Sequence, residues 1–275
     1  MTGSDIRLAF VNDRLARFAA SHPTTGKGTD TPMTSLRLAC IDAAAAPLFH
    51  LATADGTRDG YEPAVGALLA KTLGWDLSWV FLPWAELLPA LDDKRADAVL
   101  CGQGITAARL AVADFTEPYG VFHESVLVRS GSGLASAADL AGKQVGAIAG
   151  STNMALASTF AGATTVGFGG SSADVFGDML AALRSGEVDA VVDDDVVFVP
   201  LADDPDFDLA FTVQTGNRWG LAVSKSRPAL LDALDEALAT VKDSGQLEAA
   251  WKQWLPALDY PFASLPDAQS PDTAE

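Results

Sequence analysis

The stretch DLSWVFLPWAELLPALDDKRADAVLCG, residues 76–102, decides the fold class of this sequence. Its first part, DLSWVFL (76–82), alternates as a strand does, and its last part, ADAVLCG (96–102), is a short apolar run typical of a buried strand. Between them, AELLPALDDK (85–94) has the apolar spacing of a helix, and only Pro89 disagrees. A strand, a helix and a strand in this order predict two parallel strands joined by a crossover.

The same alternation extends in both directions from this stretch. LRLACID (36–42) predicts a strand and PAVGALLAKTLGW (63–75) predicts a helix, so the first half of the chain forms a βαβαβ unit. That order predicts an α/β fold with helices on both faces of a parallel sheet. A second unit follows, with predicted strands at 143–150, 164–169 and 188–194 and predicted helices at 151–160 and 172–186.

Two further segments flank the second unit and alternate as strands, FHESVLVRS (122–130) and RWGLAVSKS (218–226). They could be two crossovers, the second returning the chain so that a helix at 228–245 packs on the first unit. Periodicity alone leaves that return open. Two α/β units in series predict two lobes.

The two ends of the chain differ from this pattern. Apolar residues at steps of three and four predict a short amphipathic helix at 5–20, and a polar linker rich in Gly, Pro and Thr follows it up to residue 33. Residues 261–275 have no apolar periodicity and predict a disordered tail. Charged residues interrupt every candidate signal-peptide core near the N-terminus, so the sequence by itself predicts no export signal.

Composition argues against several classes of function. The chain has 275 residues, and its formal net charge of −18 disfavours nucleic acid and anionic membrane surfaces as partners. No run approaches the roughly 20 apolar residues that span a bilayer. Cys40 and Cys101 each lie in an apolar segment, so we expect buried free thiols. The three histidines are scattered, and the sequence therefore predicts neither a metal site nor a cofactor.

Five segments resemble, in order, those of the amino-acid-type (family 3) solute-binding proteins of ABC transporters. The most specific is GITAARLAVADFTEPY (104–119), which is similar to the family's small residues, Ile-Thr, two variable positions, Arg and then Asp-Phe-Thr/Ser-x-Pro-Tyr. The resemblance covers about residues 35–258. The other four segments are GYEPAVGALLAKTLG (60–74), WAELLPAL (84–91), DLAGKQVGAIAGST (139–152) and GEVDAVVDD (186–194).

This resemblance implies the periplasmic binding protein type II fold, in which two hinge strands join two α/β lobes around a cleft. We then expect lobe 1 at 34–126 and 223–260 and lobe 2 at 127–222. It also implies a monomer that captures an amino acid or a similar carboxylate, closes on it without catalysis, and delivers it to an ABC-transporter permease. Such proteins work outside the cytoplasmic membrane, which conflicts with the missing export signal.

Arg109 is the first candidate ligand-binding residue. It follows the strand that ends near Cys101, and open α/β sheets bind ligands at the carboxyl ends of their strands. Its planar guanidinium matches a carboxylate bidentately, and the resemblance assigns it to the ligand's α-carboxylate. The alternative is a surface arginine paired with Asp114 or Glu117.

The loop before Arg109 supplies three more candidates. Gly102 and Gly104 allow backbone N–H groups to approach a ligand closely, and Thr106 belongs to the Ile-Thr of the motif. The family usually has serines in this loop, so Cys101, Gly102 and Gly104 depart from its pattern and remove hydroxyl donors. A glycine-rich turn without function is the alternative.

The second unit contributes candidates from two strand ends. Ser151 and Thr152 open a helix directly after a strand, and the resemblance places Thr152 against the same carboxylate as Arg109. A plain helix cap explains Ser151 equally well. Asp194, within the run 193–195, aligns with the family's amine-binding aspartate; because adjacent acids repel, we expect one or two of them to face the cleft, and the alternative is a solvated loop.

Trp84 and His50 complete the candidates. Trp84 aligns with the aromatic wall that packs on the ligand's side chain, and His50 lies in the loop after the first strand. Ala45 stands where family members often have an aromatic residue, which predicts extra space and therefore either a bulkier ligand or one held from one face only. Two other functions stay open, namely a dehydratase acting on prephenate-like acids on the same fold, with an aspartic acid as general acid, and a stand-alone sensor.

Overall fold

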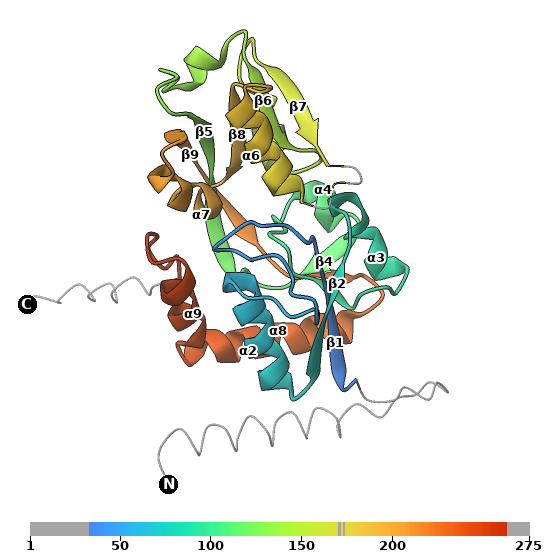
Figure 1. The fold of residues 1–275 in the computed structure, drawn as a ribbon. Helices are drawn as coiled ribbons and strands as arrows, with labels where there is room; N and C mark the ends of the chain where they lie inside the picture. The colour runs from blue at the N-terminus through green and yellow to red at the C-terminus, as the bar shows by residue number, and fades with distance from the viewer. Residues whose placement is uncertain (1–32, 170–171, 173, 263–275) are drawn as a thin grey trace, which may run out of the picture. The chain divides into compact units, whose positions relative to one another are not determined.

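The protein was analysed as a computed structural model that describes residues 33–169, 172 and 174–262 (Figure 1). The chain divides into Met1–Met33 and Thr34–Glu275, and the description below concerns the described residues of the second part. The helix predicted at 5–20, and almost all of the predicted linker and C-terminal tail, lie outside the described residues.

The first sheet has the strand order β2-β1-β3-β10-β4. Its predicted parallel core is confirmed, because β1 pairs in parallel with both β2 and β3, whereas β10 is antiparallel to β3 and β4. The strands are β1 (Ser35–Cys40), β2 (Asp76–Phe81), β3 (Ala98–Val99), β4 (Ala113–Phe115) and β10 (Ala222–Ser224).

Helices α2, α8 and α9 pack on one another beside this sheet (Figure 1). They are α2 (Tyr61–Leu73), α8 (Pro228–Asp243) and α9 (Gln246–Trp254), and the short helix α4 (Ala107–Leu110) precedes β4. Because α8 contacts both α2 and β10, the chain does return to the first sheet, which periodicity had left open.

The helix predicted at 85–94 is wrong as one element. The segment forms a 3-10 turn, η1 (Trp84–Glu86), and a separate short helix, α3 (Pro89–Asp92). Pro89 occupies the first turn of α3, where a missing N–H costs nothing, and it would break a helix that ran through it.

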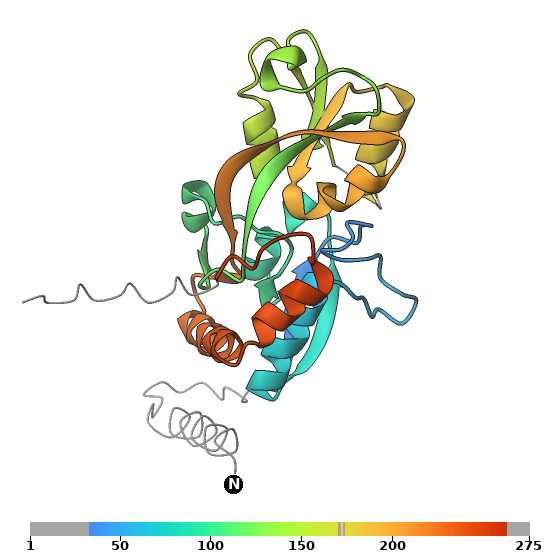
Figure 2. The same ribbon diagram turned by 90° about the vertical axis from the view of Figure 1, so that its left-hand side faces the viewer.

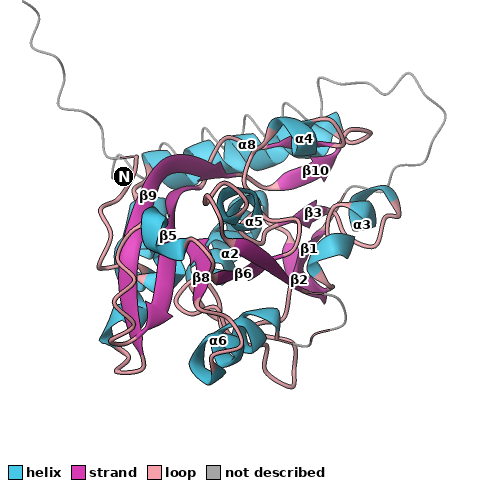
Figure 3. Cartoon of the chain, turned by 90° about the horizontal axis from the view of Figure 1, so that it is seen from above, coloured by secondary structure: helices cyan, strands magenta, loops and turns pink. Residues whose placement is uncertain are grey.

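The second sheet has the order β7-β6-β8-β5-β9, and Figure 3 shows β6, β8, β5 and β9 side by side. Strands β6, β7 and β8 are parallel, as predicted, and β5 and β9 are antiparallel additions. The strands are β5 (Gly120–Arg129), β6 (Gln144–Ile148), β7 (Thr164–Phe168), β8 (Ala190–Asp194) and β9 (Phe207–Trp219). The helices are α5 (Thr152–Ala157), α6 (Val175–Ser185) and α7 (Asp195–Phe198), with 3-10 turns η2 (Ala137–Leu140) and η3 (Pro200–Asp203).

The long strand β9 was not predicted upstream of residue 218. It is an edge strand and mostly half-exposed, so its sequence FDLAFTVQTGNRW lacks a clean apolar alternation. The segment predicted as one strand at 218–226 is divided between the end of β9 and β10. At the break, a Cβ on Gly220 would lie 2.9 Å from the carbonyl oxygen of Thr116, so only glycine allows this approach.

Both cysteines are buried and free, as predicted. The inner parallel strands β1, β3, β6 and β8 are largely buried. The core of the second sheet consists of Val126, Val128, Leu140, Val145, Ala147, Ala157, Phe160, Ala190 and Val192. In the described part of the chain, no helix has the length and apolar character needed to cross a membrane.

Candidate functional site

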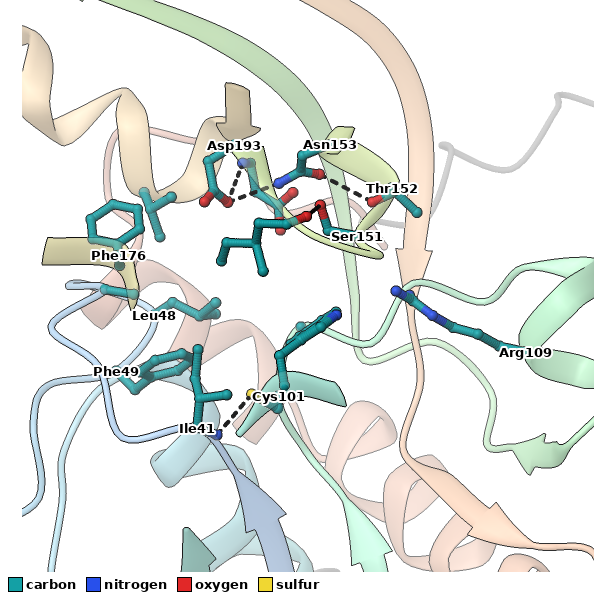
Figure 4. Close-up of a pocket in the computed structure, with 16 residues that line it drawn as sticks. Ile41, Leu48, Phe49, Cys101, Arg109, Ser151, Thr152, Asn153, Phe176 and Asp193 are labelled. Atoms are coloured by element: carbon teal, nitrogen blue, oxygen red, sulfur yellow. Dashed lines mark hydrogen bonds between the residues drawn. The ribbon is translucent and has the colours of Figure 1, made fainter. Parts of the chain in front are cut away.

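A pocket with a cavity volume of about 50 Å³ lies at the carboxyl ends of strands from both sheets (Figure 4). Its first side comes from the loops after β1 and β3 and from α4, and its second side from the ends of β6 and β8 and the start of α5. The lining residues are Ile41, Ala45, Leu48, Phe49, Trp84, Cys101, Gly102, Arg109, Ile148, Ser151, Thr152, Asn153, Phe176, Asp193, Asp194 and Val197. Six of the nine residues predicted from the sequence are therefore brought together here.

Arg109 is held with its guanidinium in the pocket. The Thr106 hydroxyl caps α4 by accepting from the Arg109 backbone N–H, and Arg109 Nη1 donates to the carbonyl of Gly104 at 2.9 Å. The guanidinium lies 5.4 Å from the ring centre of Trp84, within cation–π range. Burial lowers the pKa of Arg109, and the charge of Asp194 partly offsets that effect.

The predicted alternative, a surface ion pair of Arg109 with Asp114 or Glu117, is not formed. Asp114 instead pairs with Lys225 at 2.9 Å. Among the described residues no carboxylate forms a salt bridge with Arg109, although 2.9 Å and 3.5 Å contacts reach the carbonyls of Gly104 and Gly150. The guanidinium thus keeps donors for a carboxylate that enters from outside.

The start of α5 forms the opposite side of the pocket. The Ser151 hydroxyl accepts from the Met154 backbone N–H at 3.0 Å and donates to the carbonyl of Ile148 at 2.7 Å, so it caps the helix. Thr152 Oγ1 donates to Asn153 Oδ1 at 3.1 Å. Asn153 was not predicted, although it directly follows Thr152 and is 5% exposed.

Asp193, Asp194 and Asp195 are all buried, so the alternative of a solvated loop is wrong. Asp193 and Asp194 line the pocket, whereas Asp195 accepts the His123 backbone N–H at 3.0 Å, which agrees with one or two acids facing the cleft. Asp193 Oδ1 accepts from Asn153 Nδ2 at 2.9 Å and from the Asp194 backbone N–H at 2.8 Å.

These carboxyl groups hold their protons more tightly than usual. Burial, with a contribution from the charge of Glu124, raises the pKa of Asp193 to about 7. Burial and the charge of Asp193 raise the pKa of Asp194 well above its usual value. Asp194 Oδ1 is buried and has no hydrogen-bond partner among the described residues.

Three predicted residues do not line the pocket. His50 is exposed, because the turn that bridges Ala45 and Phe49 buries Phe49 and leaves the next residue outside. Thr106 serves as the cap of α4. Gly104 accepts from Arg109 Nη1 through its carbonyl, and a Cβ there would lie 3.3 Å from the same Nη1, so a larger residue would require a small shift of the guanidinium.

Glu62 lies directly behind the pocket and was not predicted as a functional residue. It is fully buried, and its Oε1 accepts from the backbone N–H of Gly102 at 2.5 Å and from the hydroxyl of Tyr119. Burial raises its pKa to about 7. Its place in the segment 60–74 was visible in the sequence, but its contact with the pocket loop depends on tertiary packing.

Several apolar pocket residues also lacked a sequence signal, because core residues have the same pattern. A larger cavity of about 320 Å³ adjoins the pocket and shares Ile41, Trp84 and Ile148 with it. Its remaining lining includes Asp42, Phe81 and Ser172. Ala45 lines the smaller cavity and not the larger one, so the extra space expected beside it stays a prediction. In the described residues no group of three metal-ligating side chains is present.

Comparison with known proteins agrees with this architecture. A model of the bacterial extracellular solute-binding proteins, family 3, matches residues 38–257. The L-cystine-binding protein TcyJ of Escherichia coli K12 is 29% identical over 218 residues, which are 77% of this chain and 79% of that protein. The ABC transporter arginine-binding protein 1 of the same strain is 27% identical, over 76% of this chain and 87% of that protein.

A solved structure agrees as well. An ancestral arginine-binding protein bound to arginine has a TM-score of 0.74 and 27% identity to this chain, and the alignment covers 82% of this chain and 99% of that one. The family resemblance and the two-lobe α/β fold expected from the sequence are thereby confirmed.

Proposed function

Because this chain belongs to the bacterial extracellular solute-binding proteins of family 3, we propose that its pocket captures the carboxylate and ammonium groups of an amino acid. One observation carries this proposal. Arg109, which has no carboxylate partner among the described residues, shares a buried pocket with Asp194, whose Oδ1 has no donor there. A zwitterion supplies the two missing partners, a carboxylate for the guanidinium and an ammonium group for the aspartate.

Binding couples to closure of the two lobes in this proposal. Arg109 and Trp84 come from the side of the first sheet, and Thr152 and Asp194 from the side of the second. A ligand that touches both sides favours the closed state over the open one and shifts the population toward it. Strands β5 and β9, which run side by side in Figure 2, are the hinge through which the lobes move.

The ligand then passes to an ABC-transporter permease outside the cytoplasmic membrane, with the binding protein acting as a monomer. The relatives TcyJ and arginine-binding protein 1, which are named for binding rather than for catalysis, support this role. The permease contact uses surfaces other than the pocket, because the pocket is occupied during delivery.

A thermal-shift screen of amino acids tests the proposed function. A ligand that binds only the folded state stabilises it and therefore raises the melting temperature. At a ligand concentration of a hundred times Kd, the stabilisation is about 2.7 kcal/mol. We expect at least one amino acid to give a shift that its methyl ester does not give, since the ester removes the charge that Arg109 binds. No shift with any amino acid, or equal shifts with acid and ester, would contradict the proposal.

Mass spectrometry of the same samples separates binding from catalysis. The raised pKa of Asp193 would suit a general acid, as a dehydratase requires. Recovery of unchanged ligand is expected for a binding protein, and time-dependent loss of water from a hit would support the enzyme instead.

A further inference from the structure

The pocket contains more acidic than basic groups. Its ionisable lining residues include Arg109 as a cation and Asp193 and Asp194 as acids. A third carboxyl group, that of Glu124, stands opposite Asp194 on the neighbouring strand β5 and is 1% exposed. An α-amino carboxylate brings one positive and one negative charge, so its head group leaves this excess of acid unchanged.

Two of these buried acids, Asp194 and Glu124, each keep one oxygen without a hydrogen-bond donor among the described residues. Asn217 Nδ2 donates to Glu124 Oε1 at 2.6 Å, yet Glu124 Oε2 and Asp194 Oδ1 are buried without a partner in the described part of the chain. His123 contributes little, because its Nδ1 accepts from the backbone N–H of Gly216. Unpaired polar atoms at this depth are costly, and a cationic group bound in the pocket would compensate Asp194 Oδ1, which lines it.

Asp193 is placed differently from Asp194. Its Oδ1 is occupied by two donors, Asn153 Nδ2 and the Asp194 N–H, and these fix the carboxyl group while Oδ2 keeps no partner in the described residues. In Figure 4 it lies across the pocket from Arg109, on the same side as Phe176 and Leu48. A fixed carboxylate beside apolar side chains suits a ligand whose side chain has a methylene stem and ends in a positively charged hydrogen-bond donor.

We propose that the pocket selects amino acids whose side chain carries a second positive charge, an ammonium or a guanidinium group, and that Asp193 determines this specificity. The inference rests on the proposed function and adds the ligand's charge class to it. Arg109 and Asp194 take the head group, and Asp193 takes the end of the side chain. Phe176 and Leu48 pack on the aliphatic stem between them.

Isothermal titration calorimetry with two matched ligand pairs tests this assignment. Arginine is compared with citrulline, in which a neutral urea group replaces the guanidinium, and lysine is compared with norleucine, which lacks the terminal amine. In the parent protein we expect at least one cationic member to bind tenfold or more tightly than its neutral partner. Equal or tighter binding of both neutral members would overturn the proposal.

The variant Asp193→Asn tests the contribution of the Asp193 charge alone. The side-chain amide keeps an oxygen for Asn153 and for the Asp194 N–H, so the local hydrogen bonds persist while the charge is lost. We expect the cationic ligand to lose tenfold or more in affinity, while the neutral ligand changes by less than about threefold. An equal loss for both members of the pair would show that Asp193 has only a structural role.

Asp189→Asn is the matched control. Asp189 lies just before the other end of β8, where it accepts the Gln144 backbone N–H and faces Arg129 and Lys143, so its loss removes the same charge away from the pocket. This control should keep the parent's preference between the two ligands. If no amino acid binds the parent at all, the proposed function itself fails, an outcome distinct from an absent charge preference.

Discussion

At the scale of single residues, the pocket depends on a buried acid that does not line it. Glu62 holds the backbone N–H of Gly102, a pocket residue with a φ of 56°, and thereby fixes the turn that leads to Arg109. Since a positive φ suits glycine, this loop needs both Gly102 and an acceptor behind it. The arrangement explains how a chain without the family's loop serines keeps a defined loop.

Glu62→Gln should change the pH dependence of stability. The folded protein keeps the Glu62 proton up to a pKa of about 7, whereas the unfolded chain loses it near 4.5, so stability falls as the pH rises between these values. Glutamine has no such proton. We expect the unfolding free energy of the variant, relative to the parent, to rise by about 2 kcal/mol from pH 5 to pH 8.

Urea unfolding at the two pH values measures this difference. Asp193 and Asp194 also make the unfolding free energy depend on pH, but both proteins contain them, so their contribution cancels in the comparison. The exposed Glu86→Gln serves as the control for loss of an acidic charge. Parallel stability curves for Glu62→Gln and the parent would mean that Glu62 is ionised in the folded state.

Some residues of the candidate site could be predicted from the sequence, and others could not. Arg109, Asp194 and Thr152 follow strand ends, and parallel sheets gather such positions at one edge, so motif and topology together predict them. His50 could not be assigned, since one turn decides whether it or Phe49 faces inward.

At the scale of elements, α6 joins the two sides of the cleft through its cap. Asp174 Oδ1 accepts from the Gly177 backbone N–H within α6 at 3.0 Å and from the Ala44 backbone N–H at 3.1 Å, beyond β1. A single carboxylate therefore caps a helix on one side and binds the loop on the other. If the two sides close on a ligand as proposed, this contact would add to the stability of the closed arrangement.

Asp174→Ala should lower stability by about 1 kcal/mol through loss of the cap, and ligand affinity by about three- to tenfold through loss of the Ala44 contact. Asp174→Ser separates the two effects, because serine caps a helix but is too short to reach Ala44. Titration calorimetry and thermal unfolding of both variants provide the readouts. Undiminished affinity in both variants would rule out a role in closure.

Elements also differ in how well the sequence predicts them. The inner parallel strands β1, β3, β6 and β8 are largely buried and read as apolar runs, so they were found, whereas the edge strand β9 was not. The helical spacing of apolar residues at 85–94 did not reveal the break at Pro89. Such spacing indicates which residues share a face of a helix, but not whether the backbone hydrogen bonds continue.

At the scale of the whole molecule, two sheets of similar build meet at the carboxyl ends of their strands, where ligands bind in open α/β sheets. The alternation of strands and helices predicted the two units but not the return of the chain. That return depends on β10 entering the first sheet between β3 and β4, a long-range pairing with no local signal.

Calorimetric titration of Arg109→Ala, using the amino acid found by thermal shift, tests the central claim most directly. Removing one partner of a buried charged pair costs roughly 2–5 kcal/mol, which corresponds to a loss of affinity of tens- to thousands-fold. The variant Arg95→Ala, at a half-buried arginine outside the pocket whose ion pairs are with Glu86 and Asp93, should bind as the parent does. Parent-like affinity in Arg109→Ala would contradict the account.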